Sequence, residues 1–399
     1  MNRDLEACRP HPSKQISDAI AADPEALNLT VGEPGYGPPA RLLDRVAELT
    51  RERGEDPSPG FNRYAHSRGL PKLRAAVAGY YRRRYGLEVD PDSELLVTHG
   101  GAGALWLTVF TLTNPGDEVV IPDPCYMLFE PIARSLGRVP VRIRTRAENA
   151  FRLDLRDLAA RLSPRTRLVM LNSPENPTGT VYDRATLERI LDLARERDLF
   201  VMHDEVFDSI LFRGEHVPAR LLEAESERVI LVNSFSKRFG MTGWRLGWLL
   251  APPEVVAAAA KAHTFQSLAT GTLVQEAAAE ALADPASDAE VRGHCEALQA
   301  KGLRFLRGLE AIEGFALPAG PPAGGFYAFV DVTGLGRRIG ATDGVSDAVV
   351  RYLLEHAKVG VVPGNGFGAG GEGYVRISYA APEAQLEEAL ERLRRLPLP

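Results

Sequence analysis

Residues 229–247 read Val229-Ile-Leu-Val-Asn-Ser-Phe-Ser-Lys237-Arg-Phe-Gly-Met-Thr-Gly-Trp-Arg245-Leu-Gly247. The apolar run at the start predicts a short buried strand. Lys237 comes just after this strand among small polar residues, and an amine in a confined pocket can lose its proton and form a Schiff base. Arg245 follows two glycines, so its guanidinium can turn back toward Lys237 and hold a phosphate dianion. An exposed, solvated side chain is the alternative for Lys237, and its place after a buried strand argues against it.

Apolar runs of the same kind recur between residues 90 and 250, separated by stretches with helical periodicity. The predicted strands are 95–98, 118–121, 167–172, 200–203 and 229–233, and the clearest predicted helices are 102–112 and 184–197. Continuous apolar strands joined by helical crossovers indicate a mainly parallel sheet with helices on both faces. The predicted fold class of this part of the chain is α/β.

The last third of the chain has a different pattern. It predicts a long helix at 287–313, a strand at 325–331, a helix at 346–356 and a strand at 374–379. A chain of 399 residues is too long for one ordinary hydrophobic core. We expect residues 46–290 to form a large α/β domain, residues 291–399 a smaller α+β domain, and residues 1–45 a segment that joins the small domain.

Composition excludes several classes of protein. The formal net charge of -6 argues against a nucleic-acid partner held by bulk charge, and no apolar run approaches the roughly 20 residues needed to cross a bilayer. The first residues lack the apolar core of a secretory signal. Three scattered cysteines fit reduced thiols in the cytoplasm, and no histidine spacing suggests a metal site.

Polar residues follow the predicted strands, at the edge where an open parallel sheet binds its ligands. His99-Gly-Gly-Ala-Gly103 follows one strand, Asn172-Ser-Pro-Glu-Asn-Pro-Thr-Gly179 another, and Asp204-Glu205 a third. Together with Lys237 they supply backbone NH groups, amides, a carboxylate and an amine. This set suits a phosphorylated aromatic cofactor.

Residues 234–247 resemble the lysine signature of the class I and II aminotransferases, which are enzymes of fold type I that use pyridoxal phosphate (PLP). Further motifs follow in the family's order along nearly the whole chain: Val31-Gly-Glu-Pro34, Tyr64 with Gly69-Leu-Pro-Lys-Leu-Arg74, residues 100–105, residues 172–179, Asp204-Glu-Val206 and Gly373-Tyr-Val-Arg376. The resemblance implies an aminotransferase that moves an amino group between an amino acid and a 2-oxo acid through an aldimine of PLP with Lys237.

The resemblance also implies a role for each motif. Lys237 carries PLP and then moves the proton at the substrate Cα, while Asp204 pairs with the pyridine nitrogen and keeps the ring an electron sink. Glu205 and Asp208 are the other carboxylates that could take the role of Asp204. Asn176 hydrogen-bonds the phenolic oxygen of PLP and lies beside the substrate. Tyr126 stacks on the ring.

The remaining roles concern the phosphate and the substrate. The resemblance places the phosphate at the helix opening, held by Gly101, Ala102, Ser234, Ser236 and Arg245. Tyr64 and Thr270 resemble residues that reach the phosphate from a second subunit, which implies a homodimer with shared sites. Arg376 resembles the clamp for the substrate α-carboxylate, next to Gly32 and Tyr36, although a surface ion pair is its alternative.

Two positions depart from the family pattern. Phe207 stands where the family usually has a tyrosine that donates to the phenolic oxygen, and Gly35-Tyr36 replaces the more usual Asp-Phe. These changes leave a second hypothesis open: an aminotransferase-like PLP enzyme of specialised metabolism that catalyses β/γ-elimination, replacement or carbon–carbon bond formation and cyclisation. The loss of a donor at Phe207 is expected to raise the pKa of the aldimine.

Two hypotheses from other classes have less support. A regulator built on this fold resembles a fusion with an N-terminal winged-helix domain, and about thirty residues before the first motif are too few for one. A PLP-free sugar- or dinucleotide-binding protein is the other. Gly366-Phe-Gly-Ala-Gly-Gly371 matches GxGxxG, but it precedes a strand and does not open a helix, so the dinucleotide interpretation fails.

Overall fold

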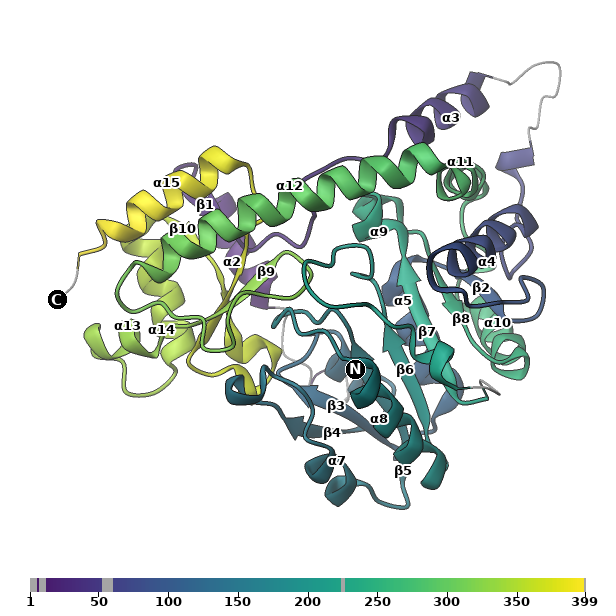
Figure 1. Cartoon of the computed structure of the whole chain (residues 1–399), viewed down its shortest axis with the longest axis horizontal. Coiled ribbons are helices and arrows are strands. Elements are labelled where there is room, and N and C mark those ends of the chain that lie inside the picture. The colour runs from purple at the N-terminus through teal and green to yellow at the C-terminus, as the bar shows by residue number, and fades with distance from the viewer. Residues whose placement is uncertain (1–5, 7–11, 52–59, 224–226, 398–399) are drawn as a thin grey trace.

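The structure is a computed structural model that describes Glu6 and residues 12–51, 60–223 and 227–397. Its largest element is a seven-stranded sheet in the order β2-β8-β7-β6-β5-β3-β4 (Figure 1). The strands are β2 (Leu95–Thr98), β3 (Glu118–Asp123), β4 (Val139–Arg144), β5 (Thr166–Asn172), β6 (Phe200–Asp204), β7 (Val229–Ser234) and β8 (Gly247–Leu250). Every neighbouring pair is parallel except those of β8, which runs antiparallel to β2 and β7. The predicted α/β class with a mainly parallel sheet is confirmed.

Helices cover both faces of this sheet because its strands are apolar on both sides. Val201 packs into the core on one face, and its neighbour Met202 packs into the core on the other. The first face is covered by α4 (Pro71–Tyr85), α7 (Leu155–Arg161), α8 (Arg184–Glu196) and α11 (Thr272–Ala283). The second face is covered by α5 (Gly100–Leu112), α6 (Phe129–Ser135) and α10 (Pro253–Ser267).

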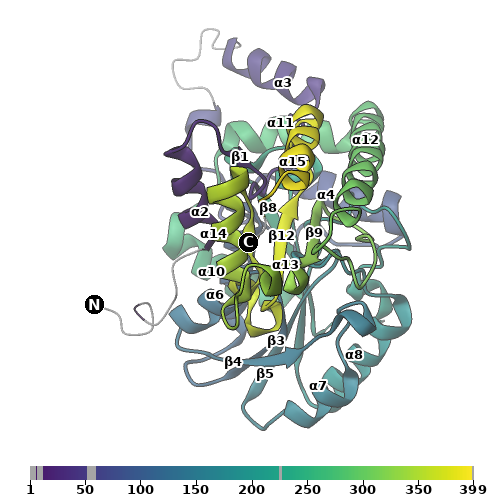
Figure 2. The ribbon, with the colours of Figure 1, turned by 90° about the vertical axis from the view of Figure 1, so that its left-hand side faces the viewer.

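The C-terminal part builds a separate core around short strands (Figure 2). One sheet has the order β11-β12-β9 and is antiparallel, and a second pairs β1 with β10 in parallel. These strands are β1 (Leu27–Asn28), β9 (Tyr327–Asp331), β10 (Val359–Gly360), β11 (Val362–Pro363) and β12 (Tyr374–Ser378). The helices around them are α2 (Pro12–Ala21), α13 (Thr333–Arg338), α14 (Val345–Tyr352) and α15 (Glu383–Arg394).

A long helix, α12 (Pro285–Glu310), connects the two cores (Figure 1). Asp284 caps it by accepting the backbone NH groups of Ala286 and Ser287. Near its start Val291 packs against the core of the large sheet, and farther along Phe305 packs into the C-terminal core. The predicted domain boundary at 290 falls inside this continuous helix, so the division into domains stays a prediction. The remaining long helix, α3 (Ala40–Arg51), packs beside α11.

Two strands of the large sheet lay outside the sequence prediction. β4 is an edge strand in which only one residue is fully buried, so it lacks the continuous apolar run of its neighbours. β8 begins at Gly247, where a Cβ would lie 2.7 Å from the backbone carbon of Gly100 and 2.8 Å from the carbonyl oxygen of Asn233. This close packing requires glycine at the start of β8. No helix among the described residues is long and apolar enough to cross a membrane.

Candidate active site

A cavity of about 220 Å³ lies at the carboxyl ends of β5, β6 and β7, where the C-terminal strands approach the large sheet. Its size suits a small ligand, because pockets for drug-sized molecules have volumes of ~300–1,000 Å³. The structure brings most of the predicted site residues together in its wall. These are Gly32, Gly101, Ala102, Tyr126, Asn176, Asp204, Ser234, Ser236, Lys237, Arg245 and Arg376.

Lys237 lies in α9 (Phe235–Arg238), a single helical turn directly after β7. Ser234 caps the turn by accepting the NH of Ser236 at 3.1 Å, and the Lys237 amine donates a hydrogen bond to the carbonyl oxygen of Gly32. Burial, and next the positive charge of Arg376, lower the pKa of Lys237 to about 8. A sizeable fraction of this amine is therefore neutral and nucleophilic near neutral pH.

Asp204 is the last residue of β6 and lines the same cavity as the Lys237 amine. Burial raises the pKa of its carboxyl group to about 7, partly offset by the hydrogen bond that it accepts from the NH of Val206 at 3.1 Å. Among the described residues no cationic side chain forms an ion pair with it. A buried carboxylate in this state is stabilised by a cationic ligand group. The rival carboxylates Glu205 and Asp208 do not line the cavity.

One end of the cavity is suited to an anion. Helix α5 begins there, and the backbone NH groups of Gly101 and Ala102 belong to its first turn, where free NH groups and the helix dipole attract negative charge. Arg245 has a left-handed backbone with φ 56°, which turns its side chain against Gly100. A Cβ on Gly100 would lie 2.6 Å from Arg245 Nη2, so only glycine allows this approach.

At the opposite wall Arg376 is presented by β12. Its Nη1 donates to Asn176 Oδ1 at 3.1 Å, and its Nη2 donates to the carbonyl oxygen of Thr30 at 2.7 Å. The guanidinium carbon lies 4.1 Å from the centre of the Tyr327 ring, a cation–π contact. Gly32 keeps space open here, since a Cβ would lie 3.1 Å from the Tyr327 hydroxyl. A planar donor held in this way can bind a carboxylate with two parallel hydrogen bonds.

Three predicted site residues lie outside this cavity. The Tyr36 ring stacks on His294 with ring centres 4.5 Å apart, and its hydroxyl donates to the carbonyl oxygen of Lys237 at 2.7 Å. Tyr36 therefore stabilises the backbone of the turn that carries Lys237, and it lines a neighbouring cavity. Tyr64 is 84% exposed. Thr270 is buried, and its hydroxyl has no hydrogen-bond partner within the part of the chain that the structure covers.

Sequence reasoning placed Asn172 in a motif at this edge without giving it a role of its own, and it missed Tyr327; both line the cavity. Asn172 ties two site loops together, because its Nδ2 donates to the Asp204 carbonyl at 3.0 Å and its Oδ1 accepts the NH of Asn176 at 2.8 Å. Its place at the end of β5 was the available signal. Tyr327 pairs with Ser378 in β12 and so lies on the same face as Arg376, a relation that depends on the strand register.

The fold and this set of side chains define the chain as a member of a known family. The family model "Aminotransferase class I and II" matches residues 24–393, nearly the whole chain. The chain belongs to the class I and II aminotransferases, and its activity is that of an aminotransferase.

Particular relatives support this assignment. The chain is 36% identical to the aspartate/prephenate aminotransferase of Thermus thermophilus, over 99% of this chain and 98% of the relative. It is 34% identical to the aromatic-amino-acid aminotransferase 2 of Thermococcus litoralis, over 98% and 97% of the two chains. The solved structure of the Thermus thermophilus aspartate aminotransferase with maleate superposes with a TM-score of 0.91 at 33% identity, covering 100% of this chain and 99% of that one. The alternative of elimination, replacement or cyclisation is not favoured by these relatives.

Proposed function

We propose that this aminotransferase holds pyridoxal phosphate at Lys237 and moves the amino group of a monocarboxylic amino acid to a 2-oxo acid. One observation carries the proposal: an amine with a lowered pKa, a buried carboxylate that pairs with no cation among the described residues, and an anion pocket line one cavity. When bound, PLP supplies an electron sink for the charge that develops at the substrate Cα.

The residues present fit the three polar parts of this cofactor. Asp204 needs a cationic partner, and a protonated pyridine nitrogen is one. The first turn of α5, with Ser234, Ser236 and Arg245, suits the phosphate. Asn176 has an amide in the same wall, between the loop after β5 and Arg376, and we assign it to the phenolic oxygen. Tyr126 lines the cavity beside them and supplies a flat face for the ring.

Individual side chains of the cavity have separate roles in the reaction. Arg376 binds the α-carboxylate of the amino acid and fixes the orientation of its Cα. With the cofactor bound, the Lys237 amine would take the proton from the substrate Cα and hold it on Nζ for return. Burial keeps its amine able to do so, because the pKa near 8 allows both protonation states near neutral pH.

The charges of the cavity point to the class of substrate. Among the described residues of its wall, the cationic side chains are Lys237, Arg245 and Arg376. Cofactor, phosphate and α-carboxylate use all three, so a second carboxylate on the substrate meets no further cation among the wall residues that the structure describes. The apolar wall residues Leu105, Met127, Val206 and Phe207 favour an uncharged side chain, because a buried unpaired charge is costly.

We also propose that the enzyme works as a homodimer in the cytoplasm. Tyr64 and Phe265 are 84% and 79% exposed, and large exposed aromatic side chains of this kind are typical of a subunit interface. Tyr64 of each subunit then completes the phosphate pocket of the other. A reducing compartment fits Cys125 and Cys295, which are free thiols.

The test is a pair of half-reactions. Purified enzyme is mixed with single amino acids, and the absorbance of bound PLP and the release of 2-oxo acid are followed. A second 2-oxo acid is then added to regenerate the starting absorbance. We expect phenylalanine or leucine to exceed aspartate in kcat/KM by about tenfold or more, the effect of leaving a charged group unpaired. Lys237→Ala should abolish both half-reactions, with the exposed Lys261→Ala as control. Absence of PLP absorbance in the wild type would overturn the proposal.

A further inference from the structure

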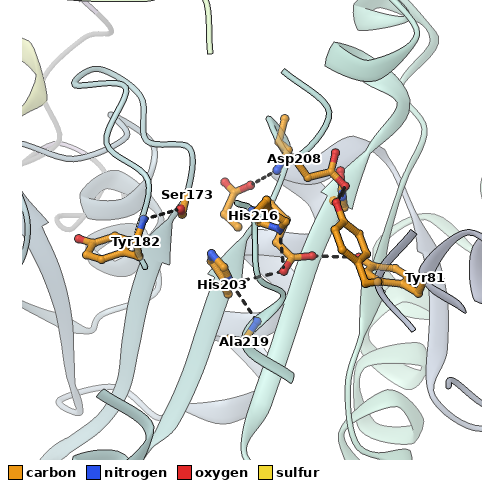
Figure 3. A network of polar contacts seen from close by, with 12 residues as sticks. Tyr81, Ser173, Tyr182, His203, Asp208, His216 and Ala219 are labelled. Carbon is orange, nitrogen blue, oxygen red and sulfur yellow. Dashed lines mark hydrogen bonds and ion pairs between the residues drawn. The ribbon is translucent and has the colours of Figure 1, made fainter. Parts of the chain in front are cut away.

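The turn that carries Asp204 has two faces. Asp204, Val206 and Phe207 line the cavity, whereas Glu205 and Asp208 point to the other side of the turn and are buried there. On that side they meet tyrosines of α4 and the segment that contains His216 (Figure 3). The mechanism above gives no task to this buried polar network.

Glu205 lies at the centre of a small cluster of polar groups. Its Oε1 is 3.3 Å from Nδ1 of His203 and 3.3 Å from Nε2 of His216. Its Oε2 accepts the hydroxyl of Tyr81 at 3.2 Å, while that hydroxyl accepts Trp248 Nε1–H at 3.2 Å. The side chains of Glu205, His203 and His216 are at most 2% exposed. Figure 3 shows both imidazoles directed at the same carboxyl group, with Tyr81 on its other side.

The hydrogen-bond pattern fixes where one proton must be. The backbone NH of Ala219 donates to His203 Nδ1 at 3.3 Å, so this nitrogen carries a lone pair. It cannot at the same time donate to Glu205. If Glu205 were ionised, a carboxylate oxygen and an imidazole lone pair would face each other at 3.3 Å in a buried site. A proton on Oε1 removes this conflict. It can be directed at Nε2 of His216, 3.3 Å away, because the one lone pair of His203 Nδ1 already accepts the NH of Ala219.

The arginines near the cluster form their contacts with other groups. Arg84 donates to the Asp208 carbonyl at 3.2 Å, and Arg238 pairs with Asp288 and stacks on Tyr80 at 4.8 Å. The charged and titratable groups that face Glu205 and its neighbours come from β6, the following turn, α4, α9 and the segment before Ala219. They are His203, Asp204, Asp208, Tyr80, Tyr81, Tyr85, Arg84, Arg238 and His216.

The two buried carboxyl groups of the turn are therefore in different states. Asp208 accepts Tyr80, Tyr85 and Asn233. Although burial raises its pKa, nearby positive charge, first that of Arg84 and also that of Arg238, and the hydrogen bond from Tyr80 outweigh this and leave the pKa lowered. No arginine or lysine of the described residues pairs with Glu205, so burial raises its pKa to about 8. Burial also lowers the pKa of His203 and of His216 to about 4. Asp208 is the anion and the Glu205 cluster is neutral.

We propose that Glu205 is a positioning residue for Asp204: it holds a proton between His203 and His216, and this neutral cluster fixes the turn that presents Asp204 to the cofactor nitrogen. The proposal rests on the proposed function, because it assigns Asp204 to that nitrogen. Loss of the proton would place carboxylates on consecutive residues and set Glu205 against His203. The turn would then loosen as the pH rises.

The first test measures thermal unfolding of the PLP-free protein against pH for the wild type and Glu205→Gln, which keeps the shape and a donor. The pKa of Glu205 is higher in the folded state than the ordinary 4.5, so its favourable contribution is complete below 4.5 and is lost as pH rises toward 8. We expect the unfolding temperature of the variant minus that of the wild type to rise between about pH 5 and about pH 8. A difference that stays constant overturns the proposal.

Glu118→Gln is the matched control. Glu118 is also a buried glutamate, at the far end of β3 from the cavity, but it is hydrogen-bonded by Ser163, Thr166 and Arg165. Although burial raises its pKa, these partners outweigh this and lower it. Its stabilising contribution is present above 4.5 and is lost only as pH falls. The difference between this variant and the wild type should stay flat over the same range.

A second measurement needs no substitution at Glu205. Nitrogen-15 NMR of histidine in the wild type reports the tautomer of each ring, and His203→Asn and His216→Asn assign the signals. We expect His203 to be neutral with its proton on Nε2 from about pH 5 to about pH 8. An imidazolium, or a proton on Nδ1, at neutral pH would show an ionised Glu205 and overturn the proposal even if Glu205→Gln did not fold.

PLP titration then links the cluster to the site. The measured quantity is the ratio of the PLP affinity of Glu205→Gln to that of the wild type. If Glu205 positions Asp204, this ratio should increase several-fold as pH passes about 8. Effects of pH on Lys237 are common to both proteins and cancel in the ratio. An unchanged ratio overturns the positioning role. Failure of the wild type to bind PLP at any pH would instead overturn the proposed function, so the two failures are distinct.

Discussion

Arg376 Nη1 donates to Asn176 Oδ1 at 3.1 Å, although the two residues are 200 positions apart in the chain. Arg376 belongs to β12 of the C-terminal sheet, and Asn176 to the loop that follows β5 of the large sheet. The bond joins the two cores across the cavity and aims the guanidinium before any substrate arrives. A donor that is already oriented loses less entropy when it binds a carboxylate.

The first prediction concerns this guanidinium. Arg376→Lys keeps the charge but removes the planar fork, so a single ammonium must replace donors to Asn176, to Thr30 and to the substrate. We expect the KM for the amino acid to rise about 10- to 100-fold, as for the loss of a hydrogen bond to a charged group of about 1.5–3 kcal/mol. Steady-state kinetics measure it, with Arg394→Lys at the exposed end of α15 as the control. An unchanged KM would contradict the clamp.

The second prediction concerns the amine of Lys237. Its pKa is lowered to about 8 by burial and by Arg376, so it becomes neutral and reactive as pH rises through about 8. In the PLP-free protein its rate of acetylation, followed by mass spectrometry, should have its midpoint there. A lysine in a short unstructured peptide, acetylated in parallel, has its midpoint at about 10.4. A midpoint for Lys237 equal to that of the peptide would exclude an activated amine.

A third prediction tests the substitution at Phe207. This ring is buried in edge contacts with Phe326 and Tyr327, with ring centres 5.4 and 5.9 Å away, and it lines the cavity. Phe207→Tyr adds a donor that stabilises an ionised phenolic oxygen on the cofactor. The pH-dependent absorbance change of bound PLP should therefore move to lower pH, by about one unit for about 1.4 kcal/mol. Phe110→Tyr, at a 45% exposed position, should leave it unmoved.

A fourth prediction tests the shared site. Tyr64→Ala and Lys237→Ala should each be inactive as homodimers. If Tyr64 serves the site of the partner subunit, a purified mixed dimer of the two variants contains one site free of both changes and recovers roughly half of the wild-type activity. Differently tagged subunits allow the mixed dimer to be isolated. If Tyr64 serves its own subunit, both sites stay defective and no activity returns.

The central strands of the large sheet could be predicted because local patterns in the sequence mark them. The strands β2, β5, β6 and β7 are short apolar runs buried on both faces, and they stand out between amphipathic helices. β8 was missed because it is short, its first residue is a glycine fixed by backbone packing, and its neighbour β2 is distant in sequence. β4 was missed because an edge strand is only partly buried.

Site residues next to predicted strands could likewise be found from the sequence, whereas those placed by contacts between distant parts of the chain could not. Asp204 ends a buried strand and Lys237 lies in the turn after another, so strand prediction placed them at one edge of the sheet. Tyr36 was expected beside the substrate, but its orientation depends on a stacking contact with His294, which no local pattern reveals. The cluster of Glu205 with His216 likewise depends on how the chain returns to β6 after a loop.

The packing at Gly247 has a consequence for how this enzyme can change. Backbone atoms of Gly100, Gly101 and Asn233 all lie within 2.8 Å of where its Cβ would be, so any larger residue forces main chain apart. Such positions tolerate almost no mutation, since backbone cannot move aside as a side chain can. New substrate preferences are therefore expected to evolve at side chains that line the cavity, such as Phe207 and Tyr327. A library for directed evolution is best concentrated there.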